Sequence, residues 1–296
     1  MTEDPRWPRA SGWLAEGRGP DLAVLGVPTH LTSISRTGAG ATPGAIRAAL
    51  ARYSTYSAAH DVDLATVAVI DAGDVADPDA DSAHVIDRVR AVMVASRLLV
   101  ALGGDNSLTY GVALGAWGEE LGTAGLVTLD AHHDLRDGVS NGSPVRRLVE
   151  AGLDGSRIVQ VGIADFANSR EYAARARDLG ITVITRAVLR RRPIADALAE
   201  ALAVACSAGG PVHVDIDVDV CDRSVAPACP ASVPGGLSAD EIRQVAFLAG
   251  RSPVVRSIDI AEIDATADAA DGRTVRLGAL LVLEAAAGLA VRRSTQ

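Results

Sequence analysis

Short apolar runs alternate with longer amphipathic or alanine-rich stretches along most of this chain of 296 residues. An apolar run of roughly four to eight residues that ends in glycine, proline or aspartate is typical of a buried strand, whereas a longer stretch after a capping residue or a proline is typical of a helix. The runs predict strands at 21–28, 67–71, 98–102, 125–130, 157–162, 181–184, 211–214 and 254–260. Helices are predicted at 43–53, 82–96, 108–121, 168–179, 195–207 and 273–291, and two more begin at Pro144 and after Ser238.

Alternation of strands with helices, without a hairpin signal, favours a mainly parallel sheet that is covered on both faces. Ser238, with Glu241 three residues later, predicts a capping box at the start of its helix. We find no linker and no internal repeat. We therefore expect one α/β domain over residues 1–296, with a loose, proline-containing extension at about residues 1–20.

Two stretches carry acidic or imidazole side chains at every second position, Asp130 to Asp134 (Asp-Ala-His-His-Asp) and Asp215 to Asp219 (Asp-Ile-Asp-Val-Asp). In an extended chain such side chains point to one face. Both stretches follow apolar runs, so we expect them at the carboxyl ends of buried strands, where open α/β sheets carry their sites. A solvated acidic strand face explains one such stretch equally well, but two together favour a shared site.

A cluster of carboxylates favours a bound cation, because two of them about 5 Å apart repel by roughly 3 kcal/mol at an effective dielectric constant of about 20. Oxygen ligands with one or two imidazoles suit Mn²⁺, with Co²⁺, Fe²⁺ and Zn²⁺ as alternatives.

Composition excludes several other classes of protein. The formal charge of −9 argues against a general nucleic-acid surface. We expect no membrane span, since even the apolar run 277–291 contains Glu284, and no signal peptide, so a cytoplasmic location is expected. All 28 basic residues are arginines, which excludes a P-loop and lysine Schiff-base chemistry. Three cysteines without CxxC spacing argue against a zinc knuckle or a disulfide framework.

Several motifs in a fixed order resemble those of the ureohydrolase family, which includes arginases, agmatinases and formimidoylglutamases. They are Gly103-Gly104-Asp105-Asn106-Ser107, Asp130-Ala131-His132-His133-Asp134, the acids Asp217, Asp219 and Asp222 followed by Ala226-Pro227, Pro234-Gly235-Gly236-Leu237, and Asp259 with Glu262. The similarity runs from about Asp21 to the final helix, and the ordered set is far more specific than any single motif.

The resemblance implies a three-layer α/β/α fold with a mainly parallel sheet of about eight strands, and a centre of two Mn²⁺ ions. In that pattern Asp130 and Asp217 bridge the ions, and His132 and Asp219 complete the coordination of one ion. Asp134 ligates the other ion and accepts a proton from the attacking water. Glu262 orients the cationic, amidine-like group of a small substrate. The family also implies a homo-oligomer, a trimer or a hexamer.

Three positions depart from the common pattern. Asn106 stands where most arginases and agmatinases have a histidine ligand, and we expect it to be a metal ligand here. The alternatives are that only one ion binds, or that His133 or water completes the coordination. Asn106 as the N-cap of the next helix is the structural alternative. Asn141 stands where related enzymes often carry a histidine thought to shuttle protons, and Asp215 where the family usually has serine or threonine.

The loop 134–147 predicts the substrate, because it brings arginines near the site and arginine is suited to bidentate recognition of carboxylates. Its Asp-Leu-Arg and Asn-Gly-Ser-Pro segments resemble the formimidoylglutamase branch of the family. We expect Arg136, Asn141, Ser143 and Arg146 to bind the substrate together with Glu262. A solvated helix face is the alternative for Arg146 or Arg147.

The sequence thus favours Mn²⁺-dependent hydrolysis of N-formimidoyl-L-glutamate, which carries two carboxylates, to L-glutamate and formamide in histidine degradation. A guanidino hydrolase that releases urea from agmatine, guanidinobutyrate or a related compound uses the same chemistry with a different pocket. A non-catalytic family member with a weakened metal site is the alternative from another class.

Overall fold

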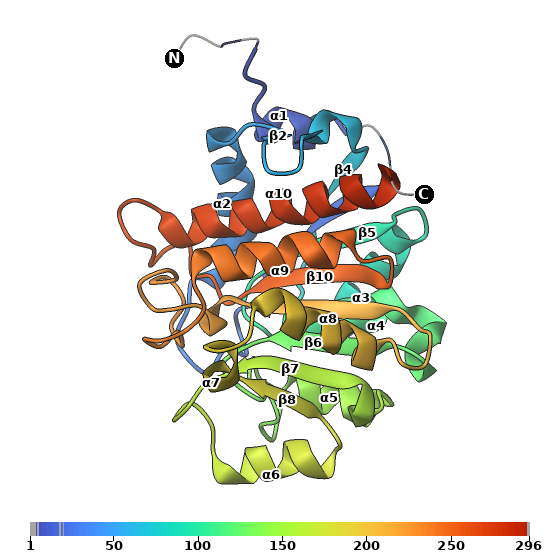
Figure 1. Ribbon diagram of the computed structural model, residues 1–296, viewed down its shortest axis with the longest axis vertical. Coiled ribbons are helices and arrows are strands. Elements are labelled where there is room, and N and C mark those ends of the chain that lie inside the picture. The colour runs from blue at the N-terminus through green and yellow to red at the C-terminus, as the bar shows by residue number, and fades with distance from the viewer. Residues whose placement is uncertain (1–3, 5, 18, 20, 295–296) are drawn as a thin grey trace.

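Eight parallel strands form one central sheet in a computed structural model of the chain, which describes residues 4, 6–17, 19 and 21–294 (Figure 1). From edge to edge the strands are β4 (Val69–Asp74), β1 (Leu22–Val27), β5 (Leu98–Gly103), β10 (Val255–Ala261), β9 (Val212–Asp217), β6 (Gly125–Leu129), β7 (Ile158–Ile163) and β8 (Thr182–Thr185). Every neighbouring pair is parallel. All the predicted strands are therefore present, with slightly shifted ends.

Helices cover both faces of this sheet. One layer contains α1 (Ala10–Ala15), α2 (Thr42–Ala49), α7 (Arg186–Leu189), α8 (Ile194–Ala205), α9 (Ala239–Arg251) and α10 (Arg273–Ser294). The other contains α3 (Ser82–Met93), α4 (Leu108–Trp117), α5 (Pro144–Ala151) and α6 (Arg170–Asp178). The predicted three-layer α/β/α fold is confirmed.

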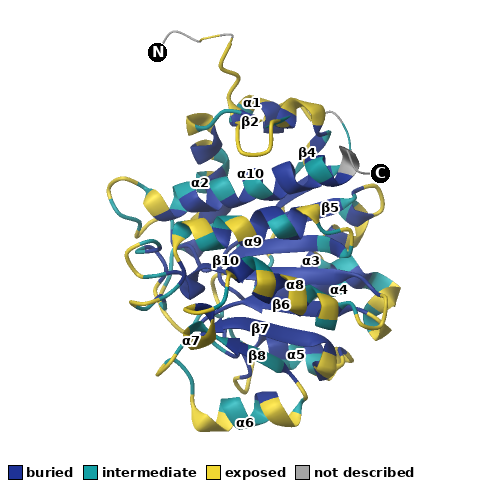
Figure 2. Cartoon of the chain, viewed as in Figure 1, coloured by how far each residue is buried: buried dark blue, intermediate teal, exposed yellow. Residues whose placement is uncertain are grey.

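Successive residues of each strand pack against opposite layers, as the pleat of a strand requires. In β1, Leu22 and Val24 belong to the cluster that holds α9 and α10, whereas Ala23 and Leu25 pack with α3 and α4. The inner strands are consequently buried on both faces, which Figure 2 shows as a dark blue centre, whereas the edge strands β4 and β8 are partly exposed. This burial explains why they read in the sequence as continuous apolar runs.

Two predicted helices end earlier than expected, and each continues as a 3₁₀ turn. The first, α2, ends at Ala49 and is followed by the turn Leu50–Arg52. The second, α4, ends at Trp117, because Gly118 adopts a left-handed φ of 55° before the turn Gly118–Gly122. The predicted capping box of α9 is confirmed. Further 3₁₀ turns are Ala39–Ala41, Leu64–Thr66, Gly155–Arg157 and Val218–Val220.

The amino-terminal region is more ordered than expected. Helix α1 lies within the segment that we predicted to be a loose extension, and Trp13 is buried with its Nε1 donating to the backbone oxygen of Val67 at 3.1 Å. Its apolar surface fixes the segment on the sheet edge, so the prediction was wrong for residues 10–15. A short antiparallel hairpin, β2 (Tyr56–Ser57) with β3 (Val62–Asp63), was also missed, since strands of two residues leave no periodic pattern.

Helix α10 contains one stretch, Arg273–Arg292, that is long and apolar enough to cross a membrane by length and composition. This differs from the expectation that the chain has no such stretch. Of its apolar window, 72% is buried inside the protein, largely against α9 and α2. This degree of burial is typical of a core helix. Such a helix has apolar residues on most of its sides because other elements cover most of them.

Candidate active site

Four neighbouring strands at the centre of the sheet carry the candidate residues at their carboxyl ends. Asn106 lies shortly after β5, Asp130 directly follows β6, Asp217 ends β9 and Glu262 directly follows β10. Because parallel strands end at the same edge of a sheet, the four loops meet there. The structure thus brings together residues that are more than 150 positions apart, such as Asn106 and Glu262, which share a hydrogen bond.

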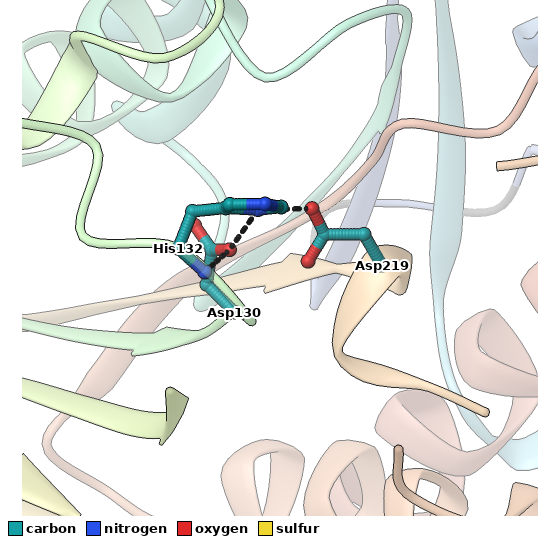
Figure 3. Close-up of side chains that lie close together, drawn as sticks. All are labelled: Asp130, His132 and Asp219. Atoms are coloured by element: carbon teal, nitrogen blue, oxygen red, sulfur yellow. Dashed lines mark hydrogen bonds and ion pairs between the residues drawn. The ribbon is translucent and has the colours of Figure 1, made fainter. Parts of the chain in front are cut away.

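Asp130, His132 and Asp219 form a compact group of potential metal ligands, in which one ligand atom of each lies within 4.8 Å of the others. His132 Nδ1 lies 2.6 Å from Asp219 Oδ2 and 3.5 Å from Asp130 Oδ1. In Figure 3 the imidazole nitrogen is directed toward both carboxylates. Asp134 and Asp217 line the same cavity as His132 and Asp219.

Turns, not extended strands, bring these side chains together. Strand β6 ends at Leu129, and Asp134 has a left-handed φ of 52°. Strand β9 ends at Asp217, whose side chain accepts from the backbone nitrogen of Asp219 at 2.8 Å in a 3₁₀ turn. The predicted alternation therefore fails beyond the strand ends, although the predicted convergence of the two stretches holds.

The carboxylates of this cluster disturb one another's titration. Burial, with the charges of neighbouring aspartates, raises the pKa of Asp130 and of Asp217 well above the ordinary value. Burial also raises the pKa of Asp134 to about 7. For His132 burial acts in the opposite direction, but the adjacent Asp219 carboxylate raises its pKa to about 9. Asp219 alone has a lowered pKa, because the charge and hydrogen bond of His132 outweigh its burial.

A divalent cation fits this arrangement. Buried carboxylates without compensating charge are costly, and Asp130 Oδ2 is fully buried with no hydrogen-bond partner among the described residues. The donor set combines several carboxylate oxygens with one imidazole nitrogen and no thiolate, which suits Mn²⁺ and related ions.

Asn106 lies beside the cluster in an orientation that differs from the expected one. Its Nδ2 donates to Asp134 Oδ2 at 2.7 Å, and its Oδ1 accepts from Thr109 Oγ1 at 2.8 Å. The amide nitrogen, not the oxygen, therefore faces the carboxylates, as the charge of Asp134 favours. The expectation that Asn106 is a ligand stays a prediction. The N-cap alternative is wrong, since Ser107 occupies the cap position of α4 without a side-chain cap bond.

Glu262 closes the opposite side of the cluster. Its Oε1 accepts from the backbone nitrogen of Asn106 and from Asn141 Nδ2, each at 2.8 Å. Like Asp134 it has a left-handed backbone, with φ of 65°. Burial raises the pKa of Glu262 to about 7 despite these two donors. Asn141 is held in turn by the backbone nitrogen of Ile34, which donates to its Oδ1 at 3.0 Å.

A cavity of about 380 Å³ opens over these acids. Its lining includes the charged or polar residues His132, His133, Asp134, Arg136, Asn141, Asn168, Tyr172, Asp217, Asp219 and Glu262. Arg136 is exposed, and we find no hydrogen bond or ion pair of its guanidinium with any described residue. An arginine with free donors therefore lines the same cavity as the buried carboxylates.

The other residues expected to bind substrate from this loop do not line the cavity. Arg146 uses its guanidinium within the chain, donating to the backbone oxygens of Arg136 and Gly138 and to Glu150. Ser143 Oγ donates to the backbone oxygen of Ser140 at 2.8 Å. The donors of Ser143 and Arg146 thus serve contacts within the loop, and substrate binding by these two residues stays a prediction. The guanidinium of Arg147 lies 3.7 Å above the ring of Tyr110.

His133 was not singled out as a site residue, although it lines the cavity. Its Nδ1 lies 2.6 Å from Gln160 Oε1 on β7, and its backbone oxygen accepts from Gln160 Nε2 at 2.8 Å. Burial lowers its pKa. No local pattern signals this pairing, because Gln160 lies within an apolar strand run. His133 is not part of the compact group of Asp130, His132 and Asp219, and its recruitment as a replacement ligand stays a prediction.

A second polar group lies deeper in the sheet than the metal ligands. His213 Nε2 lies 3.0 Å from Asp259 Oδ2, and its Nδ1 lies 2.7 Å from Ser257 Oγ. The parallel register pairs β9 with β10, which places Asp215 beside Asp259. All four side chains are fully buried. Residues paired through register are close in space but distant in sequence, so spacing within one segment could not reveal them.

Comparison with known proteins identifies the class to which this fold and site belong. The chain is a member of the arginase family, whose model matches residues 20–288.

Within that family the chain is similar to formimidoylglutamases. The formimidoylglutamase of Halalkalibacterium halodurans is 36% identical over 264 residues, which cover 83% of this chain and 81% of that protein. The crystal structure of formimidoylglutamase from Bacillus subtilis superposes with a TM-score of 0.91 at 31% identity, covering 98% of this chain and 94% of that one. A Trypanosoma cruzi formiminoglutamase solved with Mn²⁺ gives a TM-score of 0.88 at 26% identity, covering 97% and 99% of the two chains. The predicted family and its branch are confirmed.

Proposed function

We propose that this protein hydrolyses N-formimidoyl-L-glutamate to L-glutamate and formamide, a reaction of histidine degradation. The observation that carries the proposal is that Arg136, whose guanidinium has no partner among the described residues, lines the same cavity as the buried carboxylates. N-formimidoyl-L-glutamate combines two carboxylates with a cationic amidine head, so its two ends match the arginine and the acids. The names of the similar formimidoylglutamases support the same substrate.

We propose that Asp130, His132, Asp134, Asp217 and Asp219 hold two Mn²⁺ ions, with one ion as the alternative. The Mn²⁺ with which the Trypanosoma cruzi formiminoglutamase was solved supports this identity. When bound, such ions supply the Lewis acidity that allows water to lose a proton near neutral pH. Asn106 contributes by holding Asp134 Oδ2 through its amide nitrogen.

The residues of the chain would then move one proton and orient the substrate. Water would add to the formimidoyl carbon while Asp134 takes one of its protons. Asp134 would return that proton to the glutamate nitrogen as the bond from the carbon to this nitrogen breaks. The proton of the remaining hydroxyl group would pass to the departing amine, which leaves formamide and L-glutamate. The raised pKa of Asp134, about 7 before any ion is considered, is compatible with both steps of transfer. Glu262 accepts hydrogen bonds from the cationic amidine head, while Arg136 binds a carboxylate at the other end.

We further propose that residues 1–296 form a single domain, that the protein is a homo-oligomer, a trimer or a hexamer, and that it works in the cytoplasm. The continuous eight-stranded sheet supports the first point. The family resemblance supports the second. The three free cysteines and acidic composition are in keeping with the third.

The test is turnover of N-formimidoyl-L-glutamate beside agmatine, arginine and guanidinobutyrate after loading with Mn²⁺, with formamide scored against urea. We expect formamide and glutamate from the first substrate and no urea from the others. Urea from a guanidino substrate would keep the metal chemistry but refute the role of Arg136 in selecting the substrate. A purified protein that retains no divalent ion after excess Mn²⁺ would refute the catalytic proposal in favour of a non-catalytic binding protein.

A further inference from the structure

Gln160 selects the tautomer of the neutral His133 ring. The amide group of Gln160 donates through Nε2 to the backbone oxygen of His133 at 2.8 Å, so its oxygen is the atom that faces His133 Nδ1 at 2.6 Å. An amide oxygen only accepts hydrogen bonds, and a hydrogen bond at this distance therefore requires the proton on Nδ1. In the neutral ring this leaves Nε2 as a bare acceptor.

The backbone around His133 is held as firmly as the ring. Its backbone nitrogen donates to Asn168 Oδ1 at 3.0 Å, and Asn168 Nδ2 donates to the backbone oxygen of Ala131 at 2.9 Å. Gln160 is fully buried, so its amide has no competing water. A rotation of the His133 ring would break the bond to Gln160 and leave a buried oxygen unpaired. The ring is consequently preorganised in one orientation.

His133 lines the cavity, and its Nε2 has no partner among the residues that the structure describes. Nor does it belong to the group of Asp130, His132 and Asp219, whose ligand atoms lie within 4.8 Å of one another. Its lone pair is thus available to a molecule in the cavity. An acceptor at this place selects for hydrogen-bond donors and repels carboxylates, whose oxygens can only accept.

We propose that His133 Nε2 accepts a hydrogen bond from an amidine N–H of the substrate and so decides which end of the substrate approaches the acidic cluster. The inference rests on the proposed function. On ionised N-formimidoyl-L-glutamate the amidine head carries the only N–H donors, whereas Arg136 offers donors that suit the carboxylates. His133 thus binds the amidine end of the substrate and Arg136 binds a carboxylate at the other end. Gln160 positions His133.

The experiment compares His133→Phe, which keeps a planar ring but no acceptor, with His133→Gln, whose amide oxygen retains one. Three quantities are measured on the Mn²⁺-loaded protein: KM for N-formimidoyl-L-glutamate, the inhibition constant of glutarate, and Mn²⁺ per chain. Glutarate has two carboxylates and no amidine. In His133→Phe we expect KM to rise about tenfold or more, because the lost hydrogen bond involves a charged head, while glutarate inhibition and Mn²⁺ content stay unchanged. His133→Gln should recover part of the loss.

Arg136→Ala is the reciprocal control, and it should weaken glutarate and substrate together. An unchanged KM in His133→Phe would overturn the inference, and so would a parallel loss of glutarate binding or a loss of Mn²⁺. If His133→Phe does not fold, Gln160→Leu releases the ring without removing it, and KM should rise by a smaller factor with glutarate unaffected. An unchanged KM there would again overturn the inference. Absence of formamide release by the unaltered protein would instead refute the proposed function itself, before any variant is compared.

Discussion

The two sides of the cavity are built in different ways. The ligand wall consists of the proposed ligands Asp130, His132, Asp134, Asp217 and Asp219, which lie at the carboxyl ends of β6 and β9 and in the turns that follow. All of them except Asp130 line the cavity. The loop wall, formed by Arg136, Asn141 and Gly142, belongs to one segment after β6. Carboxylates of the ligand wall are buried and perturb one another, whereas Arg136 is exposed and free. The chemistry of this site therefore depends on the sheet, and the choice of substrate on a few loop residues.

Breaking the ligand wall should have the largest effect. We expect Asp217→Asn to lose Mn²⁺ binding and to reduce turnover by more than about a hundredfold, which is the upper range for removing a group that merely holds a ligand in place. Removing one negative charge from the cluster relieves repulsion, so the metal-free variant should be no less stable than the metal-free parent. Mn²⁺ per chain and thermal unfolding with and without Mn²⁺ measure both effects.

The exposed Asp87 of α3 provides the matched control for this change. Asp87→Asn removes the same charge far from the cavity, and its Mn²⁺ binding and turnover should equal those of the parent. Parental Mn²⁺ content in Asp217→Asn would show that the ligand wall has been assigned wrongly.

Breaking the loop wall should weaken substrate binding without removing the metal. In Arg136→Ala we expect KM for N-formimidoyl-L-glutamate to rise by a factor that corresponds to about 1.5–3 kcal/mol, the value of a charge-assisted hydrogen bond. Arg147→Ala is the matched control, because Arg147 follows the same loop in α5 but packs on Tyr110. Equal KM values for the two variants would refute carboxylate binding by Arg136.

The pH dependence of stability in the metal-free protein reports on the ligand wall and on Glu262. Folding raises the pKa of Asp134 and of Glu262 to about 7, so the folded state binds more protons than the unfolded chain between their ordinary values and about pH 7. Stability contributed by these protons is therefore lost as pH rises through about 7. The pKa of His132, raised to about 9, extends the loss toward that pH.

Urea unfolding of chelator-treated protein between pH 5 and 9 measures this loss, and we expect a steady fall that Mn²⁺ largely removes. A rise in stability over the same range without metal would contradict the charge balance assigned to the ligand wall.

A change outside both walls should have the smallest effect. Ser238→Ala removes the capping box of α9 and should cost about 1 kcal/mol of unfolding free energy. KM and Mn²⁺ content should not change, because α9 contributes no residue to the cavity lining. Unfolding by urea measures the loss of stability. Turnover at one substrate concentration below KM should equal that of the parent.

Sequence could predict the sheet because parallel strands buried on both faces leave continuous apolar runs, as in Leu22–Val27 and Leu98–Gly103. It also located the ligand wall, since chain order alone puts Asp130 and Asp217 at strand ends. It could not predict contacts made through register or by loop donors. The orientation of Asn106 depends on Asp134, and the placement of His133 depends on Gln160, neither of which follows from local spacing.

The left-handed backbone of Asp134 and Glu262 limits how far this protein can be stabilised without harm. Non-glycine residues in that conformation typically cost on the order of 1–3 kcal/mol each, and the surrounding packing has to sustain it. Replacement by glycine would relieve the backbone at both positions while deleting a carboxylate that the proposed reaction uses. A selection for thermal tolerance alone would therefore be drawn toward inactive proteins at these two positions, so any such selection needs turnover as a second criterion.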